Sequence, residues 1–87
     1  MHYIIINEWA NDANCECGVR IMGIAHSDAA AQKIFDACVQ KLKDIAGENG
    51  WTIYSDTDTE FDSGESGFYM GNHERLYIEM ISCGDEQ

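Results

Sequence analysis

The sequence predicts an α+β fold of order ββαββ, in which a four-stranded antiparallel sheet carries one helix packed on one face. Two runs of β-branched and apolar residues come first, a long segment with helical spacing follows, and two alternating segments complete the chain. This order places two strands on either side of a single helix. With 87 residues, 45% of them hydrophobic, we expect a single α+β domain that spans residues 1–87.

The first two strands are predicted at residues 3–9 and 19–25. Both runs are rich in β-branched or aromatic residues, whereas residues 10–18 are small and polar and indicate a loop. We therefore expect the two strands to pair as a hairpin. The first strand is apolar on both faces, and a single helix covers only one of them. Either a loop or a second subunit is expected to cover the other face.

A helix is predicted over residues 28–46. Ser27 offers an N-cap, and Gly47 together with Gly50 indicates the end. Apolar residues recur at alternating spacings of four and three, as on the buried side of an amphipathic helix. The residues of this expected buried stripe are Ala31, Phe35, Cys38, Leu42 and Ile45, widened by Ile34, Val39 and Ala46.

The third strand is predicted to begin at Trp51 and to continue its alternation as far as Asp62. In this arrangement the apolar residues share one face of the strand, and four carboxylates form a row on the other. The row consists of Asp56, Asp58, Glu60 and Asp62. The last strand is predicted at residues 75–81, where apolar residues alternate with Tyr77 and Glu79.

Acidic residues are concentrated in the second half of the chain. The 31 residues between Lys43 and Arg75 contain eight carboxylates and neither Lys nor Arg, in a chain with 16 acidic residues, 5 basic residues and a net charge of -11. Such a field attracts a basic protein surface and repels nucleic acid and anionic membranes. We expect a partner to bind where these acids lack a neighbouring cation. The candidate partner-binding residues are Asp56, Asp58, Glu60, Asp62, Glu65 and Glu74.

Calcium binding and acid–base catalysis both fit this acidic segment poorly. An EF-hand loop needs Gly at its sixth position and Glu at its twelfth. A loop that starts at Asp56 has Phe61 and Gly67 there, and one that starts at Asp58 fails at the same two positions. Paired catalytic carboxylates need unlike environments, which neighbours on one exposed strand do not have. We expect a protein that is not an enzyme and has no cofactor.

The four cysteines do not follow a zinc-binding pattern. Cys15 and Cys17 are separated by one residue rather than the usual two or more, and Cys38 lies on the apolar side of the helix. We expect no metal site, and no disulfide between Cys15 and Cys17 because so small a ring is strained. The thiols, including that of Cys83, are expected to be free or buried.

Composition also indicates where the protein resides. No apolar run approaches the ~18 residues of a membrane span, and the first residues lack the basic start of a signal peptide. The hydrophobic content argues against a disordered acidic tail. We therefore expect a cytoplasmic protein with reduced cysteines that does not bind membranes.

Residues 51–61 read W-x-I-x-x-D-T-D-T-x-F, and residues 67–78 read G-x-Y-x-x-N-H-x-x-L-Y-I. This pattern resembles one in small proteins of phages and mobile elements of Gram-positive bacteria. Size, acidity and architecture are also similar to those of phage-encoded anti-CRISPR proteins, some of which occupy the DNA-binding groove of a CRISPR effector. The resemblance implies a cytoplasmic inhibitor in a bacterial host cell, an acidic DNA mimic that does not itself bind nucleic acid.

Two classes of function remain open. The first is a non-enzymatic inhibitor that blocks a basic nucleic-acid-binding surface, in particular that of a CRISPR effector nuclease. The second is a small structural or accessory domain that forms a homodimer through its second sheet face, with acidity serving solubility. A metal-binding module is a minor third alternative. Affinity for a basic partner favours the first class, and obligate dimers favour the second.

Overall fold

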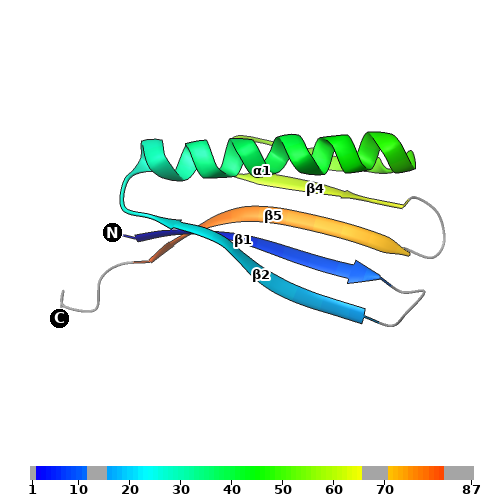
Figure 1. Ribbon diagram of the computed structural model, residues 1–87, viewed down its shortest axis with the longest axis horizontal. Coiled ribbons are helices and arrows are strands. Elements are labelled where there is room, and N and C mark those ends of the chain that lie inside the picture. The colour runs from blue at the N-terminus through cyan, green and yellow to red at the C-terminus, as the bar shows by residue number, and fades with distance from the viewer. Residues whose placement is uncertain (1, 12–15, 66–70, 82–87) are drawn as a thin grey trace.

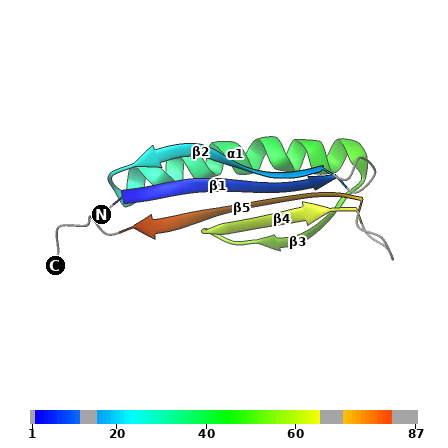
Figure 2. The ribbon, with the colours of Figure 1, turned by 90° about the horizontal axis from the view of Figure 1, so that it is seen from below.

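The computed structural model describes residues 2–11, 16–65 and 71–81. Its elements are β1 (His2–Asn11), β2 (Glu16–Ala25), α1 (Asp28–Asn49), β3 (Thr52–Asp56), β4 (Glu60–Gly64) and β5 (Asn72–Ile81). All neighbouring strands are antiparallel, in the order β2-β1-β5-β4-β3, and α1 runs along one face of the sheet (Figure 1, Figure 2). The predicted α+β architecture, one helix on an antiparallel sheet, is confirmed.

The predicted number of four strands is wrong, because the long third strand is a hairpin of β3 and β4. Between these strands Thr57 closes a tight turn. Its amide donates to the carbonyl of Glu60 at 2.8 Å, and its hydroxyl accepts from the amides of Thr59 and Glu60 at 3.3 and 3.0 Å. A threonine hydroxyl that bonds nearby backbone in this way stabilises a turn. The chain reverses here, so the predicted row of four carboxylates on one strand does not form.

β1 lies at the centre of the sheet, between β2 and β5. The predicted hairpin of the first two strands is confirmed, and both strands extend into the segment expected to be a loop. Residues 12–15 of that segment lie outside the described residues. On its other edge β1 pairs with β5 over ten residue pairs, from His2–Ile81 to Asn11–Asn72. This pairing joins segments that are far apart in the sequence into one sheet.

α1 has the predicted caps but is longer than predicted. The Ser27 hydroxyl accepts from the amide of Ala30 at 3.2 Å, and Gly50 ends the helix in the left-handed conformation with φ 69°. Gly47 does not end the helix. It lies within the last turn, where a glycine costs only about 1 kcal/mol relative to alanine.

The buried side of α1 is rotated relative to the predicted stripe. Phe35 and Leu42 are buried as predicted, whereas Cys38 is half-buried and Ile45 is 38% exposed. The buried residues are Ala31, Phe35, Val39, Leu42 and Ala46. Because alanine stands at both ends of this stripe, α1 lies close to the sheet along that line. Cys38 and Ile45 turn toward β2, where they line a small cavity of about 150 Å³ with Met22.

The core lies between α1 and the sheet face that it covers. Its largest fully buried apolar side chains are Phe35, Phe61, Ile5 and Leu76. Phe61 on β4 and Leu76 on β5 are direct register partners, so their side chains meet on the same face. We call the opposite face of the sheet, which α1 does not cover, the open face. Side chains reach it from the alternate positions of each strand.

Candidate functional site

The six carboxylates predicted to bind a partner lie in several places rather than in one row. They are Asp56 and Asp58 at the β3–β4 turn, Glu60 and Asp62 on β4, Glu65 directly after β4, and Glu74 on β5. Their partners within the chain differ from place to place. These partners decide which carboxylates are available to a second protein.

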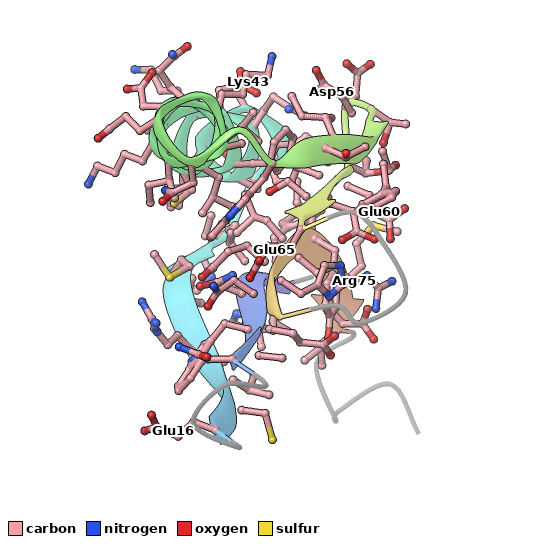
Figure 3. The ribbon with its side chains drawn as sticks, turned by 90° about the vertical axis from the view of Figure 1, so that its right-hand side faces the viewer. Glu16, Lys43, Asp56, Glu60, Glu65 and Arg75 are labelled. Carbon is pink, nitrogen blue, oxygen red and sulfur yellow. The ribbon has the colours of Figure 1, made fainter. Side chains whose placement is uncertain are left out.

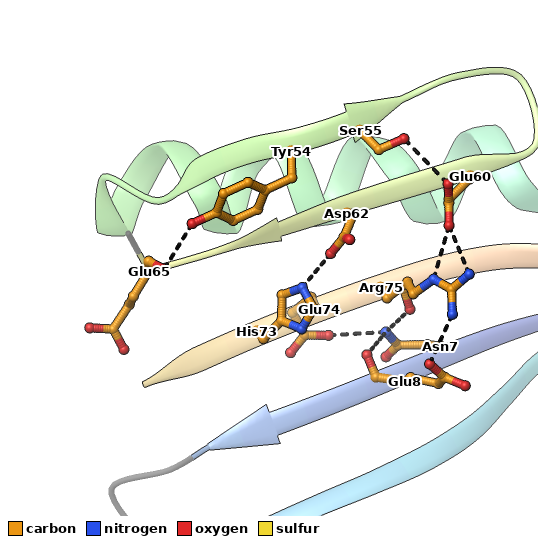
Figure 4. Close-up of polar contacts among 10 residues, drawn as sticks. All are labelled: Asn7, Glu8, Tyr54, Ser55, Glu60, Asp62, Glu65, His73, Glu74 and Arg75. Atoms are coloured by element: carbon orange, nitrogen blue, oxygen red, sulfur yellow. Dashed lines mark hydrogen bonds and ion pairs between the residues drawn. The ribbon is translucent and has the colours of Figure 1, made fainter. Parts of the chain in front are cut away.

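Arg75 is the centre of a polar network on the open face (Figure 4). Its Nε and Nη2 atoms contact Glu60 Oε2 at 2.9 and 2.8 Å, and its Nη1 atom contacts Glu8 Oε1 at 3.4 Å. The guanidinium lies 4.6 Å from the centroid of the Tyr77 ring, and the Tyr77 hydroxyl donates to Glu8 Oε2 at 2.9 Å. The hydrogen bond to Glu60 raises the pKa of Arg75, and the bond to Glu8 raises the pKa of Tyr77. One cation thus neutralises carboxylates on two other strands.

A second polar group on the open face surrounds His73. Its Nε2 atom is paired with Asp62 Oδ1, and the ring of Tyr54 meets the His73 ring edge-on with 6.5 Å between centroids. The Tyr54 hydroxyl donates to the carbonyl of Glu65 at 3.0 Å. The side chains of His73 and Asp62 are only 25% and 24% exposed. This pair therefore links β4 to β5 and presents little of its charge to solvent.

Glu65 and Glu74 accept hydrogen bonds from nearby amides. Glu65 Oε1 accepts from both the backbone and the side-chain amide of Asn72 at 2.7 Å, and Glu74 Oε1 accepts from Asn7 Nδ2 at 3.1 Å. Asn7 is 3% exposed and also donates to the Arg75 carbonyl at 3.0 Å. Four of the six predicted carboxylates therefore take part in contacts within the sheet.

Exposed carboxylates gather elsewhere, in a groove between α1 and the β3–β4 turn. The groove has a volume of about 280 Å³ and is lined by Phe35, Asp36, Val39, Gln40, Lys43, Asp56, Thr57 and Asp58. Gln32 joins its two sides, because its Nε2 atom donates to the Asp58 carbonyl at 2.9 Å and to Asp36 Oδ1 at 3.0 Å. Lys43 Nζ pairs with Asp56 Oδ2 at 3.1 Å. Figure 3 shows this pair on the helix side of the molecule, far from Glu16 on β2.

We call Asp36, Asp44, Asp56 and Asp58 the acidic edge. All four are exposed, and Asp44 adjoins the groove through Gln40, whose Nε2 atom donates to Asp44 Oδ1 at 3.1 Å. The groove-lining residues include three of these carboxylates, Asp36, Asp56 and Asp58, and one cation, Lys43, so the local net charge is −2. The expectation that the acidic segment lacks neighbouring cations is wrong, because Lys43 and Arg75 pair with Asp56 and Glu60.

Sequence reasoning missed Asp36 and Asp44, which belong to the helix and precede the main acidic run. The available signal is a repeated spacing, Gln followed by Asp four residues later, at 32 and 36 and again at 40 and 44. Residues four apart on a helix lie side by side, and both pairs form hydrogen bonds on the exposed side of α1. Only the fold shows that this side adjoins the β3–β4 turn.

The described cysteines, Cys17 and Cys38, are free thiols. Cys17 is exposed, whereas burial raises the pKa of Cys38, with Lys41 partly opposing the shift. The predictions about a Cys15–Cys17 disulfide and about Cys83 involve Cys15 and Cys83, which lie outside the described residues. Within residues 2–11, 16–65 and 71–81, no group of three or more His, Cys, Asp or Glu side chains is placed to hold a metal ion.

Comparison of the chain with models of protein families, with curated proteins and with solved structures finds no match. In the part of the chain that the structure describes, no helix is both long and apolar enough to cross a membrane.

Proposed function

We propose that this protein is a non-enzymatic inhibitor that binds a basic protein surface through its acidic edge, in competition with nucleic acid. The proposal is carried by one observation, that the carboxylates fall into two sets. Glu60, Asp62 and Glu74 on β4 and β5 are bonded within the sheet. Asp36, Asp44 and Asp58 instead lie exposed along one edge, where the only cation lining the described groove is already paired with Asp56. The second set is available to the cations of a partner.

Charge explains why a basic protein would approach this edge and why nucleic acid would not. A chain with a net charge of -11 steers a positively charged partner toward itself and raises the rate of encounter. A carboxylate accepts two parallel N–H bonds from an arginine guanidinium, as a phosphate does. A surface that holds nucleic acid with arginines therefore also fits the acidic edge.

The arrangement favours pairing with a few separate cations over imitation of a regular phosphate backbone. Asp36 and Asp44 are eight residues apart on α1, which is about 12 Å along the helix axis. Phosphates of one DNA strand follow each other every ~3.4 Å of axis. The acidic edge is thus a discrete cluster on a helix and a turn, suited to individual arginine or lysine side chains.

Within this class of partner, we propose a CRISPR effector nuclease. Such nucleases hold nucleic acid in basic channels, and some read a short DNA motif with a pair of arginines. A compact anionic chain of 87 residues is small enough to enter such a channel. The support for this narrower proposal is the resemblance in size, acidity and architecture to anti-CRISPR proteins, together with the exposed acidic edge.

The test compares two double variants that remove the same amount of charge. Asp36→Asn/Asp58→Asn changes the acidic edge, whereas Glu16→Gln/Glu48→Gln removes two exposed carboxylates that do not line the groove. Binding of each to a purified, guide-loaded CRISPR effector nuclease is measured at low and high salt, with target DNA as competitor. We expect the acidic-edge variant to lose about tenfold or more in affinity, which is about 1.4 kcal/mol, and the control to lose far less.

Equal losses in the two variants would show that net charge alone governs binding. Unchanged binding in both would exclude the acidic edge as the site. Asp56 is kept in both variants because its removal would leave Lys43 without its partner. Circular dichroism of both variants confirms that any loss of binding is not a loss of fold.

A further inference from the structure

Five neighbouring positions of the open face, two on β1 and three on β2, carry aliphatic side chains. We call this set the apolar half, and it consists of Ile4, Ile6, Val19, Ile21 and Ile24. Cross-strand register pairs Ile4 with Ile24 and Ile6 with Ile21. The three members on β2 are strongly exposed, Val19 at 64%, Ile21 at 57% and Ile24 at 59%. These exposures are high for a surface of large aliphatic side chains on an 87-residue chain.

A bulge in β2 creates this surface. Ile5 pairs with Gly23 and Ile6 pairs with Ile21, so Met22 is an additional residue in β2. Without it, Ile21 and Ile24 would point to opposite faces, because they are three positions apart. The bulge therefore brings a third β-branched side chain of β2 onto the open face, away from α1.

The adjoining strand β5 carries charges of both signs on the same face. Glu79 and Arg75 lie two residues to either side of Tyr77, so the three side chains share the open face. On β1, Ile4 pairs with Glu79, Ile6 pairs with Tyr77, and Glu8 pairs with Arg75. The opposite charges are thus spaced evenly about Tyr77. That spacing allows a surface to complement its own copy.

We propose that a second copy of the chain packs on the open face, related by a two-fold axis that lies between the two sheets, perpendicular to the strands, and passes over Tyr77. This rotation places each strand over its own counterpart in the reverse direction. Ile21 lies over Ile21 of the partner copy and Ile24 lies over its Val19, while Ile4 lies over Glu8 of the partner copy, whose charge Arg75 neutralises. Glu79 lies over Arg75 of the partner copy, and the symmetry makes this contact twice.

The open face is large enough for a stable dimer. It contains three strands of ten residues and two of five. At about 3.3 Å per residue and about 4.8 Å between strands, the flat area is about 600 Å². Side-chain relief increases the accessible area, and a standard interface takes about 800 Å² from each partner. Packed sheets stay within about 30° of alignment, which keeps residues near the axis in contact.

The apolar half fits a second copy better than a basic protein, because its members are aliphatic and the carboxylate beside them, Glu8, is already paired with Arg75. Burial of its Ile and Val side chains is favourable at any salt concentration. Two copies with a net charge of -11 each repel one another at low salt, and added salt screens that repulsion. Self-association is therefore expected to strengthen with salt, whereas binding through the acidic edge weakens. The two proposals are independent.

Sedimentation velocity of the full chain over a concentration series, at about 0.05 M and about 0.5 M salt, tests the proposal. We expect a monomer–dimer equilibrium that moves toward dimer at the higher salt. Ile21→Lys places two buried charges in the interface and should weaken the dimer about 100-fold or more. The matched control is Met80→Lys, which changes a residue that is 65% exposed and borders the helix-covered face beside Tyr3. It should leave the dimer unchanged.

The placement of the axis is tested by Glu79→Arg, which puts like charges opposite each other twice and should weaken the dimer about tenfold. A dimer that Ile21→Lys removes but Glu79→Arg leaves intact overturns this placement. A chain that stays monomeric under all conditions, or a dimer that persists in Ile21→Lys, overturns the whole proposal. Val19→Lys replaces Ile21→Lys if circular dichroism shows that the latter is unfolded. The Asp36→Asn/Asp58→Asn variant should dimerise like the parent chain.

Discussion

The two faces of the sheet are stabilised by different interactions. On the covered face, α1 packs against Ile5, Phe61 and Leu76, which are all 0% exposed. On the open face, side chains of β4 and β5 form an ionic network with Glu8 of β1 around Arg75, and the apolar half lies beside it, with its β2 members exposed. Apolar burial contributes far more per side chain than partly exposed ion pairs do. One helix therefore stabilises one face, and the other face retains surface that a partner can bury.

The largest effect should come from the centre of the covered face. Phe61→Ala removes a fully buried side chain whose register partner is Leu76, and should lower the free energy of unfolding by about 3–5 kcal/mol. Urea unfolding followed by circular dichroism measures the change. Phe61→Leu keeps most of the volume and should cost clearly less. A loss under about 1 kcal/mol for Phe61→Ala would mean that this face is not the main source of stability.

A smaller effect is expected at the centre of the open-face network. Arg75→Met should cost about 1 kcal/mol, because the guanidinium is 40% exposed and water screens its ion pairs. The variant leaves Glu8 and Glu60 without their cation, so the loss should shrink as salt is added to the unfolding experiment. Arg75→Lys keeps the positive charge but lacks the planar guanidinium group. Its stability should lie between that of the parent chain and that of Arg75→Met. If Arg75→Met lost as much stability as Phe61→Ala, the open face would contribute as much stability as the covered face, contrary to the prediction.

Because of this network, the stability of the fold should also depend on pH in the alkaline range. The bond to Glu8 raises the pKa of Tyr77 above its usual value near 10, so the folded chain holds this proton more tightly than the unfolded chain. The resulting stabilisation is complete below about pH 10 and is lost as pH rises through the folded pKa. In unfolding measurements above about pH 10, Tyr77→Phe should therefore lose stability less steeply than the parent. Glu8→Gln keeps the Tyr77 phenol and removes the charge of Glu8. If the decrease of stability with pH is as steep in both variants as in the parent, this explanation is wrong.

The smallest expected effects differ in sign between the two faces. Ser63 is 0% exposed, and its hydroxyl has no hydrogen-bond partner within the described ranges. Ser63→Ala removes this unsatisfied group and should raise stability by up to about 1 kcal/mol. On the open face, Ser55→Ala removes a hydroxyl that contacts Glu60 at 3.4 Å and should lower stability by about 0.5 kcal/mol. Thermal unfolding of the two variants measures both changes. A Ser63→Ala variant less stable than the parent would contradict the prediction.

The helix and the strands could be predicted because their signals are local. The Ser27 cap and the β-branched runs of β1 and β2 are visible in a few consecutive residues. The β3–β4 hairpin is hidden because the alternating pattern continues through the turn, where only the hydroxyl of Thr57 favours reversal. The rotation of α1 could not be predicted either, because it depends on how closely the alanines of its buried stripe let it approach the sheet.

The candidate site could be predicted only in part, because it is assembled from separate segments. The local acidic run includes Asp56 and Asp58, which lie on the acidic edge. It cannot show that Asp36 on α1 adjoins them, since that depends on the packing of α1 against the turn. Nor can it show that Glu60 is neutralised by Arg75, because this contact depends on the register of β4 and β5.

The central pairing of β1 with β5 has a consequence for how the chain acquires its structure. Contacts between these strands join residues 61 to 79 positions apart, from Asn11 with Asn72 to His2 with Ile81. Chains dominated by such distant contacts fold more slowly than helical bundles. During synthesis, β1, β2 and α1 leave the ribosome before β4 and β5, so one edge of β1 and the part of α1 that packs on β4 and β5 still lack partners. The nascent protein therefore depends on its last strand, β5, to cover an aggregation-prone edge.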